Sequence, residues 1–313
     1  MNLRPALALI GLLFIGGCAP NSESRPGDEL PIAADFVQKT PQMPTTFVDT
    51  TGGTYAWHKF YNIVNGLENR IKIPPGFRRE PVAEGSFGAW LRGIPLKPGR
   101  PEVLLYNGAR KGNQEAHYAV IDIDVGKRDL QQCADAVMRL RAEYLYTAGR
   151  NQDIHFRFTS GDNCEWDRWR LGYRPRIQGN RVSWNKSQDE SASYPNFRAY
   201  LNMVFNYAGT ASLAKELRPV ISPTDLASGD VFIRGGFPGH AVLVMDVAIN
   251  PKSGQKVFLL AQSYMPAQEM HLLRNPTDAQ LSPWYPAEFV GDLLTPEWTF
   301  ARDELRRFAE DQD

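Results

Sequence analysis

The chain has 313 residues, of which 42% are hydrophobic, and its 35 basic and 35 acidic residues give a formal net charge of zero. This balance supplies no basic surface for nucleic acid, so we expect no nucleic-acid partner. Its five histidines and three cysteines form no cluster with zinc-site spacing, and we expect no metal and no cofactor. The length suits one large domain or two small ones.

The N-terminus has the pattern of a membrane-targeting segment. Arg4 precedes the apolar stretch Ala6–Ile15, and two glycines then lead to Cys18. An apolar stretch of about ten residues is too short to cross a bilayer, which takes roughly 20. The pattern resembles a bacterial lipoprotein signal, which implies removal of residues 1–17 and lipidation of Cys18, with palmitate among the acyl chains. An uncleaved anchor or an ordinary secretory signal is the alternative.

The residues after Cys18 indicate where the protein is held. Ala19 rather than aspartate follows the cysteine, and the resemblance to Gram-negative lipoproteins then implies the outer membrane, facing the periplasm. The expected partner is therefore the membrane, through lipidated Cys18. Residues 18–54 lack periodicity and are predicted to form a flexible tether. We expect a single domain over 55–313, with a boundary near 176–193 if it has two lobes.

The remaining sequence predicts helices and strands in an irregular order. The expected helices are a short one after Ser86, a strong one over Asp129–Tyr146, one led by Ser160, and one over Phe197–Ala208, with Trp57–Leu67 helical or extended. The expected strands are 103–106, 118–123, 154–158, 231–233, 241–247 and 256–261, and 178–193 is read as a polar loop. Because no regular strand-helix-strand period appears, we predict an α+β fold with a mostly antiparallel sheet.

His240 is the first candidate for a functional side chain. A Gly/Pro turn at 235–239 leads directly to it, an apolar strand run follows, and the next run ends at Gln262. A histidine on one strand and an amide at the end of the next is how papain-like cysteine peptidases present a base and its orienting partner. Asp246 is a second candidate for orienting His240. The structural alternative is a hydrogen-bonded strand histidine with no function.

Cys133 is the candidate nucleophile, because it is the cysteine on a predicted helix upstream of His240. It lies about one turn into that helix, where the helix N-terminus lowers a thiol pKa. The hypothesis gives a catalytic set of Cys133, His240 and Gln262. Cys133 also falls on the apolar stripe of the helix, so a packed structural thiol is the alternative. Cys133 and Cys164 either pair in an oxidising compartment or remain free.

A second alignment resembles the NlpC/P60 cell-wall endopeptidases. It matches the helix Asn196–Gly209, then Gly229-Asp230 and the run from Gly239 to Val244. In that family an Asp-Cys-Ser-Gly motif opens the helix, whereas here the nucleophile position would hold Phe197. The resemblance therefore implies a catalytically silent papain-like module whose cleft binds peptidoglycan peptide.

A longer resemblance covers nearly the whole folded part. The segments SFGAWLR (86–92), DLQQCADAVMRLRAEYLY (129–146), FTSG (158–161), GGFPGHAVLVMDVA (235–248) and LLAQSYMPAQEMH (259–271) are similar to an uncharacterised bacterial family, domain of unknown function 4846. That resemblance implies an envelope-associated protein, often a lipoprotein. It supplies no catalytic residues.

Five further side chains are candidates for the wall of a cleft around His240. They are Asp230, Asp246, Tyr264, Gln268 and His271. Gln268 could donate to an oxyanion, and His271 could return to the cleft, although a turn held by side-chain hydrogen bonds explains both.

Tryptophans suit sugar stacking, while core packing is the ordinary role of most of them. The tryptophans in question are Trp90, Trp166, Trp169, Trp184 and Trp284. Two functions stay open: a module that binds peptidoglycan peptide or an envelope partner, and a cysteine hydrolase or amidase of peptidoglycan peptides.

Overall fold

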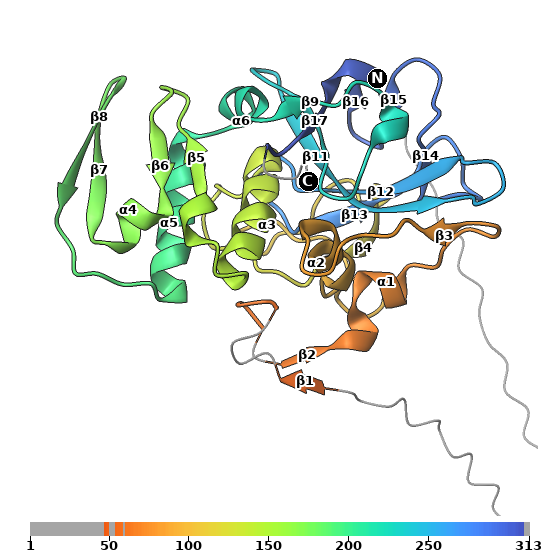
Figure 1. Ribbon diagram of the computed structural model, residues 1–313, viewed down its shortest axis with the longest axis horizontal. Helices are drawn as coiled ribbons and strands as arrows, with labels where there is room; N and C mark the ends of the chain where they lie inside the picture. Colours follow the sequence, from red (N-terminus) through yellow and green to blue (C-terminus); the bar gives the residue numbers. More distant parts are fainter. Residues whose placement is uncertain (1–46, 50–53, 59, 310–313) are drawn as a thin grey trace, which may run out of the picture. The chain divides into compact units, whose positions relative to one another are not determined.

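A computed structural model describes residues 47–49, 54–58 and 60–309 of the chain (Figure 1). The predicted signal sequence, Cys18 and most of the predicted tether lie outside these residues. The helices in the described part are α1 Leu67–Arg70, α2 Phe87–Gly93, α3 Cys133–Thr147, α4 Trp166–Arg170, α5 Tyr194–Tyr207 and α6 Thr210–Glu216. None of them is both long and apolar enough to cross a membrane.

The centre of the fold is a large antiparallel sheet. Its strands are β3 Arg78–Arg79, β4 His117–Val120, β9 Arg218–Pro219, β10 Val231–Arg234, β11 His240–Ile249, β12 Lys256–Gln262, β13 His271–Leu273, β14 Tyr285–Pro286 and β17 Leu305–Arg307. The strand order is β4-β13-β12-β11-β10-β17-β9, with β3 paired to β11 and β14 to β12. The predicted runs 231–233, 241–247 and 256–261 correspond to β10, β11 and β12, which are neighbours at the middle of the sheet.

Alternation along β11 explains why this strand is buried on both faces. Leu243 and Met245 belong to the larger apolar core, whereas Val242 and Val244 belong to a second one. Because successive side chains point to opposite faces, one strand feeds both cores. Burial of each such side chain contributes about 1.5–3 kcal/mol relative to leaving it exposed. A continuous run of β-branched and apolar residues is thus what a strand at the centre of the sheet requires.

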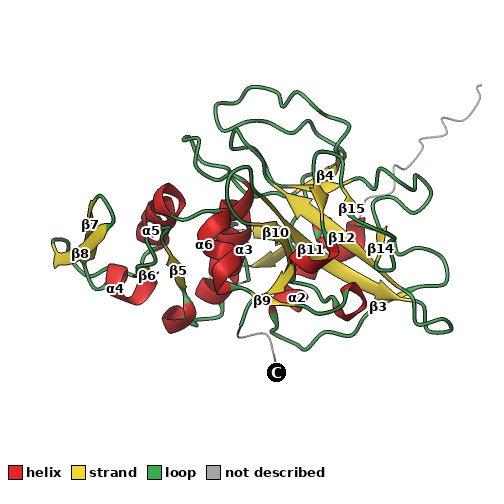
Figure 2. Ribbon diagram, turned by 90° about the horizontal axis from the view of Figure 1, so that it is seen from above, coloured by secondary structure: helices red, strands yellow, loops and turns green. Residues whose placement is uncertain are grey.

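The helices α3 and α6 cover one face of this sheet. Figure 2 shows them side by side next to β10, and α3 also packs against β11 and β12. Helix α2 packs on β11 and α3 as well, while α4 and α5 pack on one another beyond α3 (Figure 1). The consequence for the site is that the first turn of α3 is held against the sheet where β11 begins.

Four two-stranded sheets complete the described part. They are β1 Phe47–Asp49 with β2 Phe60–Asn62, β5 His155–Arg157 with β6 Asn163–Glu165, β7 Tyr173–Gln178 with β8 Arg181–Lys186, and β15 Leu293–Leu294 with β16 Thr299–Phe300. All pair antiparallel. Part of the predicted polar loop at 178–193 is therefore the strand β8.

The predicted α+β class with a mostly antiparallel sheet is confirmed. The expected strand at 103–106 is wrong, since Leu104 and Leu105 make only isolated bridges. The helix expected from Asp129 begins at Cys133 instead. Asp129 is held in a loop, where its carboxylate accepts a hydrogen bond from the backbone N–H of Ala267 at 2.7 Å. This later start places Cys133 at the first helical residue.

Candidate functional site

A pocket of about 370 Å³ lies where the first turn of α3 meets the start of β11. It is lined by the α3 entry, the end of α5 and the start of α6, the turn at 236–239 with His240, the residues just after β12, and Trp298. Cys133 and His240 both line this pocket, although they are more than 100 positions apart in sequence. The fold therefore brings together the predicted nucleophile and the predicted base.

The turn before His240 has no space for side chains at its last residue. A Cβ on Gly239 would come within 2.4 Å of the Gly236 carbonyl oxygen and 2.5 Å of the Thr210 hydroxyl oxygen. Thr210, the first residue of α6, donates to the Gly236 carbonyl at 3.1 Å. The Gly/Pro composition thus lets this turn lie against α6 and deliver His240 to the pocket.

Cys133 is half-buried with a free thiol. Backbone hydrogen bonds from Ala134, Ala241 and Cys133 itself lower the thiol pKa, but burial outweighs them and, with the nearby Asp135 carboxylate, raises the pKa to about 11. The expected lowering by the helix N-terminus is therefore overcome. The contact with Ala241 is informative because it places the sulfur beside the residue that follows His240.

His240 is buried against three aromatic rings and hydrogen-bonded on one ring nitrogen. Its Nε2 lies 2.9 Å from Gln262 Oε1. The ring centroids of Tyr264, Trp298 and Phe300 lie 4.7, 5.2 and 5.8 Å from that of the imidazole. Burial lowers the His240 pKa to about 4, opposed by the Gln262 hydrogen bond. At neutral pH the pocket thus holds a neutral imidazole beside a neutral thiol.

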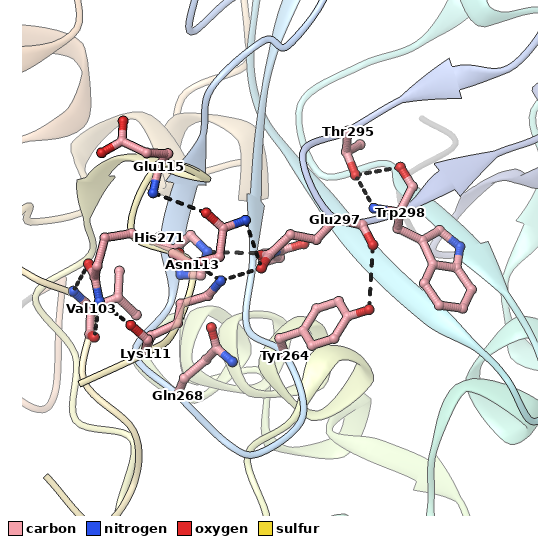
Figure 3. Close-up of polar contacts among 12 residues, drawn as sticks. Val103, Lys111, Asn113, Glu115, Tyr264, Gln268, His271, Thr295, Glu297 and Trp298 are labelled. Carbon is pink, nitrogen blue, oxygen red and sulfur yellow. Dashed lines mark hydrogen bonds and ion pairs between the residues drawn. The ribbon is translucent and has the colours of Figure 1, made fainter. Parts of the chain in front are cut away.

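The Gln262 amide is held on its other side by Glu297. Gln262 Nε2 donates to Glu297 Oε2 at 2.7 Å and lies 3.4 Å from His271 Nε2. The Glu297 carboxylate also pairs with Lys111, and Figure 3 shows Lys111, Asn113 and Tyr264 converging on Glu297. These contacts form a continuous chain of polar groups from Lys111 to His240.

Glu297 and Lys111 were missed by the sequence interpretation. Glu297 lies in the short turn between β15 and β16, and Lys111 in an irregular segment between α2 and β4. Neither position belongs to a periodic pattern, and their pairing joins residues 186 positions apart. The sequence offers only a weak signal for Glu297, which is a charged residue next to Trp298 in a short turn.

Of the predicted binding residues, Tyr264 lines the pocket and His271 lies next to the Gln262 amide. Tyr264 lines the pocket, and its hydroxyl lies 3.5 Å from the Glu297 carbonyl oxygen. His271 is fully buried behind Gln262, with Nδ1 2.8 Å from the Glu269 carbonyl oxygen. Burial lowers its pKa to about 3. It therefore contacts the Gln262 amide rather than the pocket.

Asp246 and Asp230 lie elsewhere and are fully engaged in ion pairs. The Asp246 carboxylate accepts from Arg79 and Arg92, each at 2.6 Å, and so does not orient His240. Asp230 pairs with Arg307 at 2.6 Å and faces a different pocket. The pairing register between β11 and β12 shifts between Val244 and Asp246. Beyond this shift, the Asp246 side chain contacts the two arginines and not His240.

Gln268 does not supply the expected oxyanion donor. It is buried, it is not among the lining residues of the pocket, and its Nε2 donates to the Pro266 carbonyl oxygen at 3.1 Å. The alternative interpretation of this segment, a turn held by side-chain hydrogen bonds, fits these contacts.

Phe197 lies in the aromatic core of the helical region instead of facing His240. Its ring stacks on that of Tyr146 with centroids 4.3 Å apart, and it also contacts Trp166. The helix that the second alignment treats as the nucleophile helix, α5, does not contribute Phe197 to the pocket.

The tryptophans named for sugar stacking lie mostly in the core. Trp90, Trp166, Trp169 and Trp284 are buried, and Trp184 is half-buried on β8. The tryptophan that does line the pocket is Trp298.

Cys133 and Cys164 are both free thiols, and Cys164 is buried. Within residues 47–49, 54–58 and 60–309, no group of three or more His, Cys, Asp or Glu side chains is placed to hold a metal ion.

The family model described as "Domain of unknown function (4846)" matches residues 67–307, which include every residue of the site described above. Neither a curated protein sequence nor a solved structure matches the chain.

Proposed function

Because the chain belongs to the family of domain of unknown function 4846, whose description assigns no activity, we propose a function from the site itself: a cysteine-dependent hydrolase that forms a thioester at Cys133. The observation that carries this proposal is the shared pocket of Cys133 and His240, with His240 hydrogen-bonded to Gln262 at 2.9 Å. A nucleophile, a base and a group that orients the base are the three parts of such a site.

The proposed reaction divides the hydrolysis into two steps. His240 Nδ1 takes the thiol proton as Cys133 Sγ attacks the carbonyl carbon, and the imidazolium then gives that proton to the departing amine. Water next attacks the thioester, with His240 again as base, and releases the acid and the free thiol. In both steps Gln262 Oε1 accepts the hydrogen bond from Nε2–H, which stabilises the imidazolium and keeps Nδ1 available.

The electrostatics favour a general-base mechanism over a preformed ion pair. The Cys133 pKa is raised to about 11 and the His240 pKa is lowered to about 4, so both groups rest in their neutral forms. Proton transfer and attack on the carbonyl then occur together. The backbone N–H groups at the start of α3 that contact the thiol are suited to stabilise the developing oxyanion, since the first N–H groups of a helix have no partner within it.

We propose papain-like character on the same grounds. The order along the chain is a cysteine at the first residue of a helix, a histidine at the start of a strand, and an amide at the end of the next strand. The helix packs against that sheet. The NlpC/P60 likeness then resides in the architecture around His240, with Cys133 on α3 in place of a nucleophile on α5.

The lining of the pocket narrows the substrate class. Its lining includes two exposed apolar side chains, since Phe237 is 94% exposed and Met265 is 58% exposed. The charged residues among the described lining are Asp129 and Asp135, with no lysine or arginine. An internal amide flanked by an apolar or uncharged residue fits this lining, whereas a substrate carboxylate would find no cation.

The predicted lipid anchor places the proposed activity at the cell envelope. If Cys18 is lipidated, the domain acts at the outer membrane facing the periplasm, where peptidoglycan peptides and envelope proteins are within reach. We therefore propose an internal peptide bond of peptidoglycan or of an envelope protein as the substrate. Palmitate labelling of the full chain, compared with Cys18→Ser, tests the anchor.

A binding module without chemistry is the second candidate function. The observation that favours it is the high pKa of the Cys133 thiol, which keeps the sulfur protonated in the free protein. The pocket would then hold the same apolar peptide segment without cleaving it.

Labelling with iodoacetamide separates the two candidates. The full chain is labelled at pH 7, and the modified peptide is quantified by mass spectrometry in the native protein and in His240→Ala. We expect labelling at Cys133 that falls at least 10-fold in the variant, since a positioned base contributes about 10²–10⁴-fold. Buried Cys164 is the internal reference. Equal rates in the two proteins would reject the hydrolase and leave the binding module.

A further inference from the structure

We propose that Glu297 is a positioning residue that fixes the Gln262 amide and, through it, selects the tautomer of His240. This inference rests on the proposed function, because it concerns how the base is prepared to accept the Cys133 proton. It adds a residue that lies outside the predicted set of Cys133, His240 and Gln262.

A tight turn presents Glu297 to the site. The backbone N–H of Thr295 donates to the Trp298 carbonyl oxygen at 2.9 Å, and the Trp298 N–H donates to the Thr295 hydroxyl oxygen at 3.1 Å. The same turn supplies Trp298, whose ring packs on the imidazole of His240. The short connection between β15 and β16 therefore makes two contacts with the site: Trp298 packs on the imidazole of His240, and Glu297 accepts a hydrogen bond from the Gln262 amide.

The two oxygens of Glu297 have different partners. One accepts from Gln262 Nε2 at 2.7 Å, and the other pairs with Lys111 and lies 3.3 Å from Asn113 Nδ2. The exposed fractions of the Glu297 and Lys111 side chains are 15% and 6%. The carboxylate is thus fixed by a nearly buried cation on one side, and its other oxygen is directed at the amide.

This arrangement decides which way the amide points. A carboxylate oxygen only accepts hydrogen bonds, so the NH₂ group of Gln262 must face Glu297, and the carbonyl oxygen Oε1 must face His240. His271 reinforces the orientation, because its Nε2 lies 3.4 Å from the same NH₂ group. Gln262 Oε1 can only accept, which requires that His240 carry its proton on Nε2.

The tautomer matters because the other ring nitrogen is the proposed proton acceptor. With the proton on Nε2, Nδ1 is free to receive the thiol proton. A flipped Gln262 amide would present NH₂ to Nε2 and move the histidine proton to Nδ1, where it blocks the transfer. Glu297 therefore acts two hydrogen bonds away from His240, and it contacts no substrate.

Lys111 limits what Glu297 does to the charge of the site. The ion pair between them is neutral as a unit, so the main role of Glu297 is to orient the Gln262 amide. Glu297→Gln retains one oxygen acceptor that can face the Gln262 NH₂ group, but it loses the charge and replaces the oxygen that pairs with Lys111 by an NH₂ group. Glu297→Ala removes the acceptor altogether. The two variants thus separate orientation from charge.

The test is a long-range ¹H–¹⁵N correlation of the histidine rings of the full chain at pH 7, which distinguishes the protonated from the unprotonated nitrogen. His240→Gln assigns the signal. We expect His240 protonated on Nε2 in the native protein and in Glu297→Gln, and a mixture of tautomers in Glu297→Ala. The matched control is Glu269→Gln, which breaks a similar carboxylate–lysine pair with Lys97 but retains the backbone carbonyl oxygen that contacts His271.

Iodoacetamide labelling of the same variants at pH 7 separates the possible failures. We expect the rate of Cys133 labelling to fall about 10-fold or more in Glu297→Ala. In Glu297→Gln the rate should stay within a few fold of the native rate, and in Glu269→Gln it should not change. If His240→Ala also labels normally, the proposed function fails. If His240→Ala labels slowly while Glu297→Ala keeps the native tautomer and rate, the role of Glu297 alone is rejected. If Glu297→Ala does not fold, the tautomer in the native protein still tests the inference, because a His240 protonated on Nδ1 would overturn it.

Discussion

The two ends of strand β11 carry two buried polar side chains that do different things. His240, the first residue, has one ring nitrogen bonded to Gln262 and lines an open pocket. Asp246, about 20 Å further along at the usual rise per residue, has both oxygens bonded to arginines. Burial of a polar group therefore does not identify a functional residue; what matters is whether its bonding capacity is complete and whether it borders a pocket.

The comparison predicts opposite consequences of substitution at the two ends. Changes at the pocket end should alter chemistry with little effect on folding, and changes at the Asp246 end should alter folding with little effect on chemistry.

Removal of the sulfur is expected to have the largest effect. Cys133→Ala should lower hydrolysis of a peptide anilide by about 10³-fold or more, because the thioester can no longer form. Cys164→Ala is the matched cysteine control, since Cys164 is buried on β6 away from the pocket. Comparable activity in Cys133→Ala and the native protein would mean that another nucleophile operates.

At the other end of β11, Asp246→Ala should reduce the free energy of unfolding by about 3–5 kcal/mol, because it leaves Arg79 and Arg92 in the interior without their carboxylate. Urea denaturation measures this change. The variant should keep the His240 tautomer and the Cys133 labelling rate while it is folded. A loss of labelling in the folded variant would link the two ends and contradict the comparison.

Acid should destabilise the protein through its buried histidines. The pKa values of His240 and His271 are lowered to about 4 and 3 in the folded protein. The unfolded chain, with pKa values near 6.5, binds more protons below that pH, so stability falls as pH falls from about 6.5 towards 4. In this window the two histidines together lower the free energy of unfolding by about 3 kcal/mol for each unit that the pH falls. Urea denaturation at pH 7 and pH 5 measures this loss of stability. In His240→Gln the dependence of the free energy of unfolding on pH should be roughly half as steep.

The smallest effect is expected at the rim of the pocket. Phe237→Ala should raise KM for substrates with an apolar residue next to the scissile bond about 3- to 10-fold, with kcat nearly unchanged, since one apolar contact contributes about 1 kcal/mol. Val290→Ala is the matched control, because Val290 is equally exposed but is not among the pocket-lining residues. A fall in kcat with unchanged KM would place Phe237 in the chemistry instead.

The sequence predicted the centre of the fold and the His240–Gln262 pair for a physical reason. Strands with strong apolar runs pair locally across short connections, so the end of one hairpin strand lies next to the start of the other. It placed Cys133 one turn too deep in its helix, because the hydrogen bond from Ala267 to Asp129 that delays the helix comes from a distant segment.

The remaining errors and omissions also come from distant pairing. The arginines that pair with Asp246 precede it by more than 150 residues. Glu297, which binds the Gln262 amide, lies in an irregular turn. No period or short motif marks such partners. Local patterns therefore reveal a base and its amide partner, whereas the groups that orient or neutralise them emerge only from the three-dimensional structure.

The most direct test of the account is acylation of Cys133 by p-nitrophenyl acetate. The reagent supplies an activated acyl group, and the proposed reaction predicts a burst of p-nitrophenol with one acetyl group on the Cys133 peptide, detected by mass spectrometry after acid quenching. The burst should be absent in Cys133→Ala and at least 10-fold slower in His240→Ala, since the base removes the thiol proton as the sulfur attacks. An acetyl group found elsewhere, or equal acylation rates in the native protein and His240→Ala, would contradict the account.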